Sequence, residues 1–137
     1  MARAWRRFRP YNAANALAAA AGLGQEIPRF LEHLVRECSH LHFKALLALD
    51  PLLTNPNDIH EAPIRPDPRP LFQVLHGTFV LARNRRVHRR LVERHPGLGL
   101  EPALGRFEEP CASGLAVVTE SMKPTPRGRR LLDSLGT

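Results

Sequence analysis

The segment from Gln25 to Leu49 constrains the fold most, because it has the length and periodicity of one long amphipathic helix. At about 100° per residue, its apolar side chains share one broad face: Ile27, Phe30, Leu31, Leu34, Val35, Leu41, Ala45, Leu46 and Leu49. Charged and polar residues occupy the opposite face, where Phe43 and Leu47 break the pattern and indicate a second contact. Asp50-Pro51 ends the helix. We therefore expect this wide apolar face to contribute most of the core.

Residues 71–94 predict the second core element. A helix that begins after Pro70 would align the apolar side chains Leu71, Leu75, Phe79 and Ala82. A β-hairpin over residues 71–82, with its turn at His76-Gly77, is the alternative. The helix is favoured because the arginines that follow have good helix propensity. The predicted core is helix 25–49 packed against the first half of helix 71–94.

Length and composition predict one small domain. The chain has 137 residues, of which 43% are hydrophobic, so a modest core is expected. We expect a mainly α, single-domain helical protein with a Pro-rich connecting arm and basic extensions. Residues 1–24 form a basic N-terminal arm with an Ala-rich segment, and residues 25–122 form the helical core domain, including the Pro-rich arm 54–70. Residues 123–137 form a basic C-terminal segment with a short helix.

The C-terminal third carries weaker secondary-structure signals. Residues 96–113 are punctuated by glycine and proline and are expected to be irregular, while residues 114–119 (GLAVVT) are the best strand candidate. Thr125 and Pro126 have the residue types of a helix N-cap and first turn. A short helix from there to Leu135 is therefore predicted.

Positive charge is concentrated in three islands. The chain has a formal net charge of +7 and a pI near 10.9. Residues 1–25 carry +4, residues 83–95 carry +5 and residues 123–130 carry +4, so the remainder is net acidic. This distribution favours a polyanionic partner, an anionic membrane surface or an acidic protein.

The most informative of these islands is the arginine run, residues 82–95 (ARNRRVHRRLVERH). Its guanidinium groups repel one another and become favourable when a polyanion neutralises them. The run resembles the arginine-rich helices of some viral and phage RNA-binding proteins, and this resemblance implies RNA binding. The expected phosphate contacts are Arg83, Arg85, Arg86, Arg89, Arg90 and Arg94, with Arg6, Arg7, Arg129 and Arg130 as secondary contacts.

The C-terminal segment carries a second resemblance. Thr125, Pro126, Gly128, Leu131 and Leu132 resemble the wing strand and "TP-x-G-x-x-LL" helix that close winged-helix DNA-binding domains. This resemblance implies DNA binding. Residues 91–94 (LVER) resemble the end of a recognition region of such domains. However, about thirty residues separate them from this segment, and no helix-turn-helix pattern precedes it.

Metal and catalytic sites are not expected. His33, Cys38, His40 and His42 point to opposite sides of one helix and cannot all bind one tetrahedral metal. Cys38 and His42 could supply two ligands, with Cys111 and another histidine from elsewhere in the chain. The possible catalytic groups are Cys111, Ser113, His60-Glu61 and Glu108-Glu109, but no spacing ties a nucleophile to a base. No phosphate-binding glycine motif is present. We expect no enzyme activity, no cofactor and no small-molecule substrate.

The sequence therefore predicts a non-catalytic nucleic-acid-binding protein, with RNA favoured over DNA, acting as a subunit of a larger ribonucleoprotein-type assembly with other protein subunits. A helical adapter or scaffold of a protein-only complex is the alternative, and a winged-helix-like DNA-binding regulator is a weaker one.

Two cysteines without a metal or disulfide pattern favour an intracellular, reducing compartment, and no segment has the composition of a transmembrane helix. The acid-free, Arg- and Ala-rich N-terminus also fits a mitochondrial targeting signal.

Overall fold

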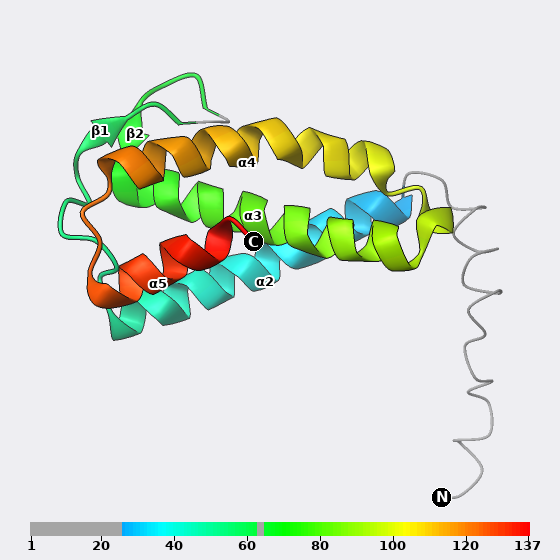
Figure 1. Cartoon of the computed structure of the whole chain (residues 1–137), viewed down its shortest axis with the longest axis horizontal. Helices are drawn as coiled ribbons and strands as arrows, with labels where there is room; N and C mark the ends of the chain where they lie inside the picture. Colours follow the sequence, from blue (N-terminus) through cyan, green and yellow to red (C-terminus); the bar gives the residue numbers. More distant parts are fainter. Residues whose placement is uncertain (1–25, 63–64) are drawn as a thin grey trace, which may run out of the picture.

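The computed structural model describes residues 26–62 and 65–137, and these are mainly helical, as predicted. The elements are α2 (Glu26–Leu49), β1 (Ile59–His60), β2 (Arg69–Pro70), α3 (Leu71–Arg94), the 3-10 turn η2 (Pro96–Leu98), α4 (Glu101–Ser121) and α5 (Pro126–Leu135). In Figure 1, α3 runs through the middle, with α4 along one side and α2 and α5 along the other. Helix α3 is therefore the centre of the bundle.

The helical interpretation of residues 71–94 is confirmed, and the hairpin alternative is wrong. Leu71 and Leu75 are fully buried and Phe79 is nearly so, which places the predicted stripe in the core. The described residues do contain a short two-stranded ribbon, but it lies in the Pro-rich arm, where β1 pairs antiparallel with β2. The arm therefore folds back and delivers the chain directly into α3.

Helix α4 overturns two expectations. Residues 96–113 are not mostly irregular and residues 114–119 are not a strand, because one helix covers Glu101–Ser121 and includes Pro110. Its buried side is formed by Ala103, Phe107, Cys111, Gly114 and Val118, at helical steps of three and four residues. Burial of this side against α3 outweighs the β-branched residues near position 117 and the hydrogen bond lost at the proline.

Helix α2 exists as predicted, but the opposite face packs on the core. Only Ser39 and Phe43 are buried in this helix, and both lie on the side expected to be polar. The Phe43 ring stacks on His76, with 4.4 Å between ring centroids, and lies 5.3 Å from Phe79. Phe30, Leu34, Leu41 and Leu49, assigned to the core from the sequence, are 49–71% exposed. The periodicity identified the apolar side correctly, but the aromatic side chain on the other side makes the core contact.

The predicted C-terminal helix is confirmed, and a hydrogen-bonded turn positions it. Thr125 caps α5, since its hydroxyl accepts a hydrogen bond from the Gly128 N–H at 3.0 Å. The same hydroxyl donates to Asp50 Oδ1 at 2.6 Å, and the Leu52 N–H donates to that oxygen at 2.7 Å. These two hydrogen bonds lower the pKa of Asp50. Leu132 of α5 then joins the core.

The turn leaves no room for a side chain at residue 128. A Cβ on Gly128 would lie 1.7 Å from the backbone oxygen of Leu52, which adopts a left-handed φ of 65°. We expect Gly128→Ala to lower the free energy of unfolding by at least about 2 kcal/mol, because backbone must move. Chemical denaturation monitored by circular dichroism measures this loss.

Gly77→Ala is the matched control, because nothing lies within 4 Å of a Cβ at that position in α3. It should raise the free energy of unfolding by about 0.5–1 kcal/mol through helix propensity. Equal effects of the two substitutions would contradict the predicted clash at Gly128.

Candidate binding surfaces

Helical geometry divides the arginine run between two sides of α3. Arg85 and Arg89 are one turn apart and point toward α4, where both approach Glu108. Arg83, Arg86, Arg90 and Arg94 recur at steps of three and four residues and share a different side. We call these four residues the arginine stripe. The six predicted phosphate contacts therefore do not form one surface.

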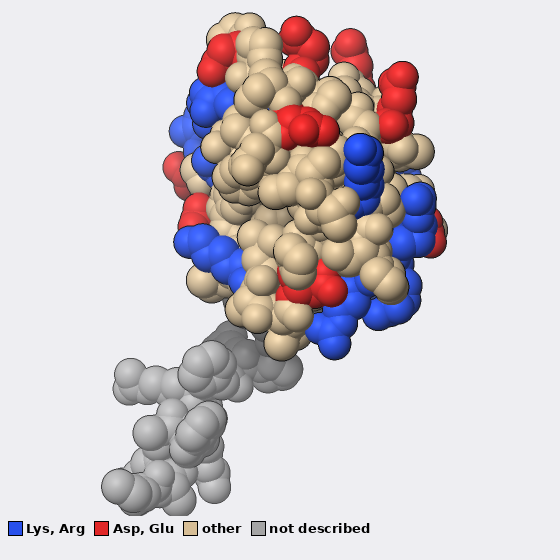
Figure 2. All heavy atoms as spheres, turned by 90° about the vertical axis from the view of Figure 1, so that its left-hand side faces the viewer, with Lys and Arg blue, Asp and Glu red and all other residues tan. Residues whose placement is uncertain are grey.

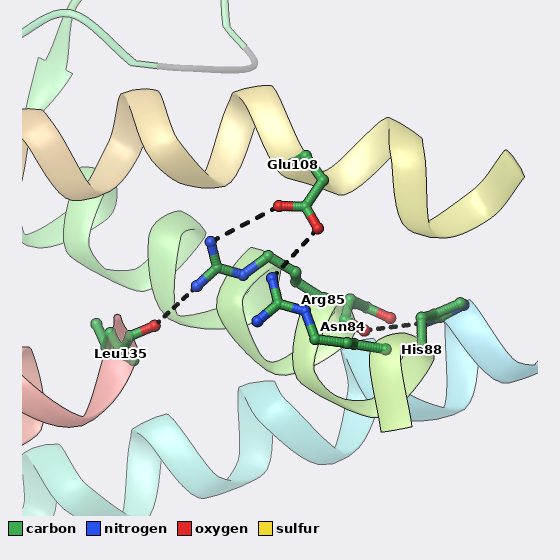
Figure 3. A network of polar contacts seen from close by, with 6 residues as sticks. Asn84, Arg85, His88, Glu108 and Leu135 are labelled. Atoms are coloured by element: carbon green, nitrogen blue, oxygen red, sulfur yellow. Dashed lines mark hydrogen bonds and ion pairs between the residues drawn. The ribbon is translucent and has the colours of Figure 1, made fainter. Parts of the chain in front are cut away.

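Arg85 and Arg89 are held by partners within the chain. Arg85 is only 8% exposed and donates to the Leu135 backbone oxygen at 3.2 Å, while its Nη1 lies 3.9 Å from Glu108 Oε2. Arg89 Nη2 lies 3.3 Å from Glu108 Oε1. Figure 3 shows the guanidinium groups converging on the one carboxylate. A buried charge is stable only with such partners, so Arg85 has a structural role in joining α3 to α4 and α5.

Two further polar residues of α3 are buried beside this network (Figure 3). His88 is 0% exposed, and its Nδ1 lies 2.8 Å from the Asn84 backbone oxygen. Its ring packs edge-on against Phe107, with 4.9 Å between centroids. Burial lowers the pKa of His88. Among the described residues, neither His88 Nε2 nor Asn84 Oδ1 has a hydrogen-bond partner, so this part of the core is polar and incompletely paired.

The arginine stripe becomes more exposed toward the end of α3. Arg83 lies over the Phe79 ring, with 5.3 Å from Cζ to the centroid, and contacts His42. Arg86 donates to the Ser134 backbone oxygen at 3.2 Å and to the Thr137 hydroxyl. The Arg86 guanidinium group thus caps the C-terminal end of α5. Arg90 and Arg94 are exposed, and neither forms an ion pair with a described residue. These two side chains are therefore the ones of the run most available to a partner.

Helix α5 brings the C-terminal basic island next to the stripe. Arg127, Arg129 and Arg130 are exposed on its first two turns. Arg127 and Arg130 line a groove with Leu46 and Leu131, and those two leucines also line the groove that contains Arg83 and Arg86. The second and third islands thus adjoin. Figure 2 views the end of the bundle where α5 begins, with most acidic side chains toward the upper edge and basic ones at the lower right and along the left side.

The N-terminal island contains Arg6 and Arg7, which lie outside the described residues. Where the winged-helix resemblance implies a wing strand before the last helix, the structure has helix α4 and then a single β-bridge between Pro124 and Leu53. The two-stranded ribbon β1–β2 precedes α3 in the chain and is therefore not the strand pair expected directly before α5.

The possible metal and catalytic residues are dispersed. Within residues 26–62 and 65–137, no cluster of three or more His, Cys, Asp or Glu side chains has the arrangement of a metal site. Cys38 is exposed, whereas Cys111 is buried, and burial raises the pKa of the Cys111 thiol. A thiol with a raised pKa is a poor nucleophile. Glu108 is engaged by the two arginines.

A cleft beneath the Pro-rich arm was not anticipated from the sequence. It has a volume of about 500 Å³ and is lined by Arg36, Arg65, Arg69, His40 and His76, among others. His40 Nδ1 lies 2.7 Å from His76 Nε2. Burial, followed by the charges of His40 and Lys44, lowers the pKa of His76. Sequence spacing gave no signal, because these side chains come from α2, the arm and α3.

Comparison of the chain with protein-family models, with curated proteins and with solved structures finds no match. None of the helices in the described ranges has the length and apolar character needed to cross a membrane.

Stability should distinguish the fold-serving arginines from the exposed ones. Arg85→Gln should lower the free energy of unfolding by about 2 kcal/mol, because it removes charge-assisted contacts to Glu108 and Leu135. Arg90→Gln should change it by less than about 0.5 kcal/mol, since the side chain is exposed. Urea denaturation of the two variants tests this, and equal losses would contradict the division.

Stability should also depend on pH through His88. The folded-state pKa of His88 lies below that of the unfolded chain, about 6.5. Below that pH the unfolded state binds more protons, so the free energy of unfolding should fall as pH decreases from 7 to 5. His88→Gln should make this dependence shallower, with His76 still contributing. Denaturation of the unmodified protein and of the variant across this range measures the two slopes, and equal slopes would contradict the contribution of His88.

Proposed function

We propose that the protein is a non-catalytic nucleic-acid-binding protein whose contact surface is the arginine stripe together with the start of α5. The observation that carries this proposal is the adjacency of two basic islands far apart in the sequence, since Arg83 and Arg86 line a groove adjoining that of Arg127 and Arg130. Arg85 and Arg89 are left out of the contact surface because Glu108 engages them.

The chemistry of this surface fits phosphate binding. Guanidinium groups form paired hydrogen bonds with phosphate oxygens, and phosphate contacts account for most of the affinity of such proteins. A helix anchored in the core at Leu71 and Leu75 holds the exposed Arg90 and Arg94 on a fixed surface. Glu93 is the one acidic residue in the run, so the stripe remains strongly positive. Four more arginines precede Glu26 in the chain and would add to the attraction.

RNA is the favoured ligand over DNA, following the resemblance of the run to arginine-rich RNA-binding helices. A small core with basic segments on both sides suits a subunit of a larger ribonucleoprotein-type assembly. Two free cysteines fit an intracellular, reducing compartment. A mitochondrial location is the alternative, based on the Arg- and Ala-rich composition of the N-terminal residues. These residues lie outside the described part of the chain.

Nucleic-acid titration at several salt concentrations tests the proposal. Labelled hairpin RNA and duplex DNA are titrated with the full chain and with the triple variant Arg90→Gln, Arg94→Gln and Arg130→Gln. Binding should weaken steeply with salt, and the log–log slope of the variant should be smaller by about one for each arginine that contacts phosphate. Because these three arginines are exposed, their replacement should leave the folded state intact.

The matched control removes the same charge elsewhere. Arg29, Arg36 and Arg65 are exposed and line other grooves, so their joint replacement by glutamine should reduce the slope much less. A flat salt dependence of the unmodified protein would refute nucleic-acid binding. Equal losses in the two triple variants would refute the assigned surface, because total charge alone would then account for binding.

A helical adapter of a protein-only complex is the second candidate, and one specific observation favours it. Phe30, Leu34, Leu41 and Leu49 of α2 are 49–71% exposed, which is unusual for side chains of this size on one helix. An adapter would show no salt-dependent nucleic-acid binding in the titration above.

A further inference from the structure

Helix α2 turns an apolar stripe away from the bundle. Leu34 and Leu41 are 49% and 69% exposed, Cys38, Ala45 and Ala48 are exposed, and Leu31 is half-buried. Phe30 and Leu49, at 68% and 71%, flank the two ends. The core contact of the helix lies on the opposite side, at Ser39 and Phe43. None of the other described elements covers this stripe, so its exposure is unexplained by the fold.

The stripe has the spacing of a two-helix contact. Leu31, Leu34, Cys38, Leu41, Ala45 and Ala48 follow one another at alternating steps of three and four residues. This heptad spacing keeps a seam facing a partner helix along its whole length. The stripe from Leu31 to Ala48 would extend such a seam over about 27 Å.

The distribution of large and small residues points to an antiparallel second copy of the same helix. When Cys38 is placed opposite Leu41 of the second copy, Leu34 meets Ala45 and Leu31 meets Ala48. Every layer then pairs one leucine with one small residue, which gives an even separation of the helices. A parallel pair would instead stack leucine on leucine at one end and alanine on alanine at the other.

The flanking charges match the same register. Glu37 and Lys44 are exposed and occupy equivalent positions beside the stripe, seven residues apart. In the antiparallel pair, Glu37 of each copy lies next to Lys44 of the other, which forms two symmetric ion pairs. In the parallel pair, neither residue meets an opposite charge. A surface that complements itself in this way is the requirement for a two-fold symmetric dimer.

We infer that the protein forms a homodimer through antiparallel contact of the α2 stripes, with Cys38 opposite Leu41 of the second copy. The inference does not depend on nucleic-acid binding, because the arginine stripe lies on α3. The partner is the chain itself, so the test needs no other component.

Sedimentation equilibrium of the full reduced chain measures the oligomeric state. The unmodified protein should be a dimer that dissociates on dilution, and Leu41→Asp should be monomeric with unchanged helix content, since Leu41 contributes little to the fold at 69% exposure. Ile59→Asp is the matched control, because Ile59 is 62% exposed but lies in the β-ribbon, and this variant should stay dimeric.

A charge exchange tests the register. Glu37→Lys or Lys44→Glu alone places like charges together at both symmetric positions and should raise the dimer Kd about tenfold. The double variant restores both ion pairs with reversed polarity and should return the Kd close to that of the unmodified protein. This rescue is specific to a contact between two copies in the antiparallel register.

Three outcomes would overturn the inference. A monomeric unmodified protein would mean that something else, such as residues 1–25, covers the stripe. A dimer that survives Leu41→Asp would place the interface elsewhere. If Leu41→Asp abolishes the dimer but the double charge variant binds no more tightly than the single charge variants, the antiparallel register is excluded. Because the nucleic-acid titration uses α3 and α5 variants, its failure would be separate from any of these.

Discussion

The helix bundle depends on a nearly buried guanidinium group at its centre. Arg85 extends from α3 to the Glu108 carboxylate on α4 and to the last residues of α5 through the Leu135 carbonyl. A charge that is 8% exposed is tolerated only when it is paired and hydrogen-bonded. The positions of α4 and α5 relative to α3 are thereby coupled to a single side chain, and Arg86 reinforces the second contact at the Ser134 carbonyl.

This coupling also determines which positive charges remain for a ligand. Glu108 contacts both Arg85 and Arg89 and offsets one of their two positive charges, so this side of the run is partly engaged by the fold. The other side keeps Arg90 and Arg94 in solvent and gains neighbours from α5. A dimer through α2 would join two such surfaces in one particle, and two linked sites bind a long polyanion more tightly than either alone. The two proposals are thus compatible, and they rest on different helices.

Several features of the fold were predictable from local sequence. Pro70 precedes α3, and Thr125-Pro126 begins α5 with the expected cap, because prolines and capping hydroxyls act within one turn. Helix α4 was missed because Gly105, Pro110 and Gly114 obscure its apolar period, although Ala103, Phe107 and Cys111 repeat at four-residue steps. The cleft beneath the arm could not be predicted at all, since its arginines and histidines come from three separate elements.

The sequence by itself determined that the chain is helical, that α2 has one apolar side, and that arginines are concentrated in the second half of α3. Only the tertiary structure decided that α2 packs through Phe43 and leaves Leu34 and Leu41 in solvent, and that Arg85 is a structural residue while Arg90 is exposed. The physical reason is that the periodicity of apolar residues shows only which side chains share one side of a helix, and it depends on residues a few positions apart. The partner of each face is chosen by contacts between distant segments, such as Phe43 with His76 and Arg85 with Leu135.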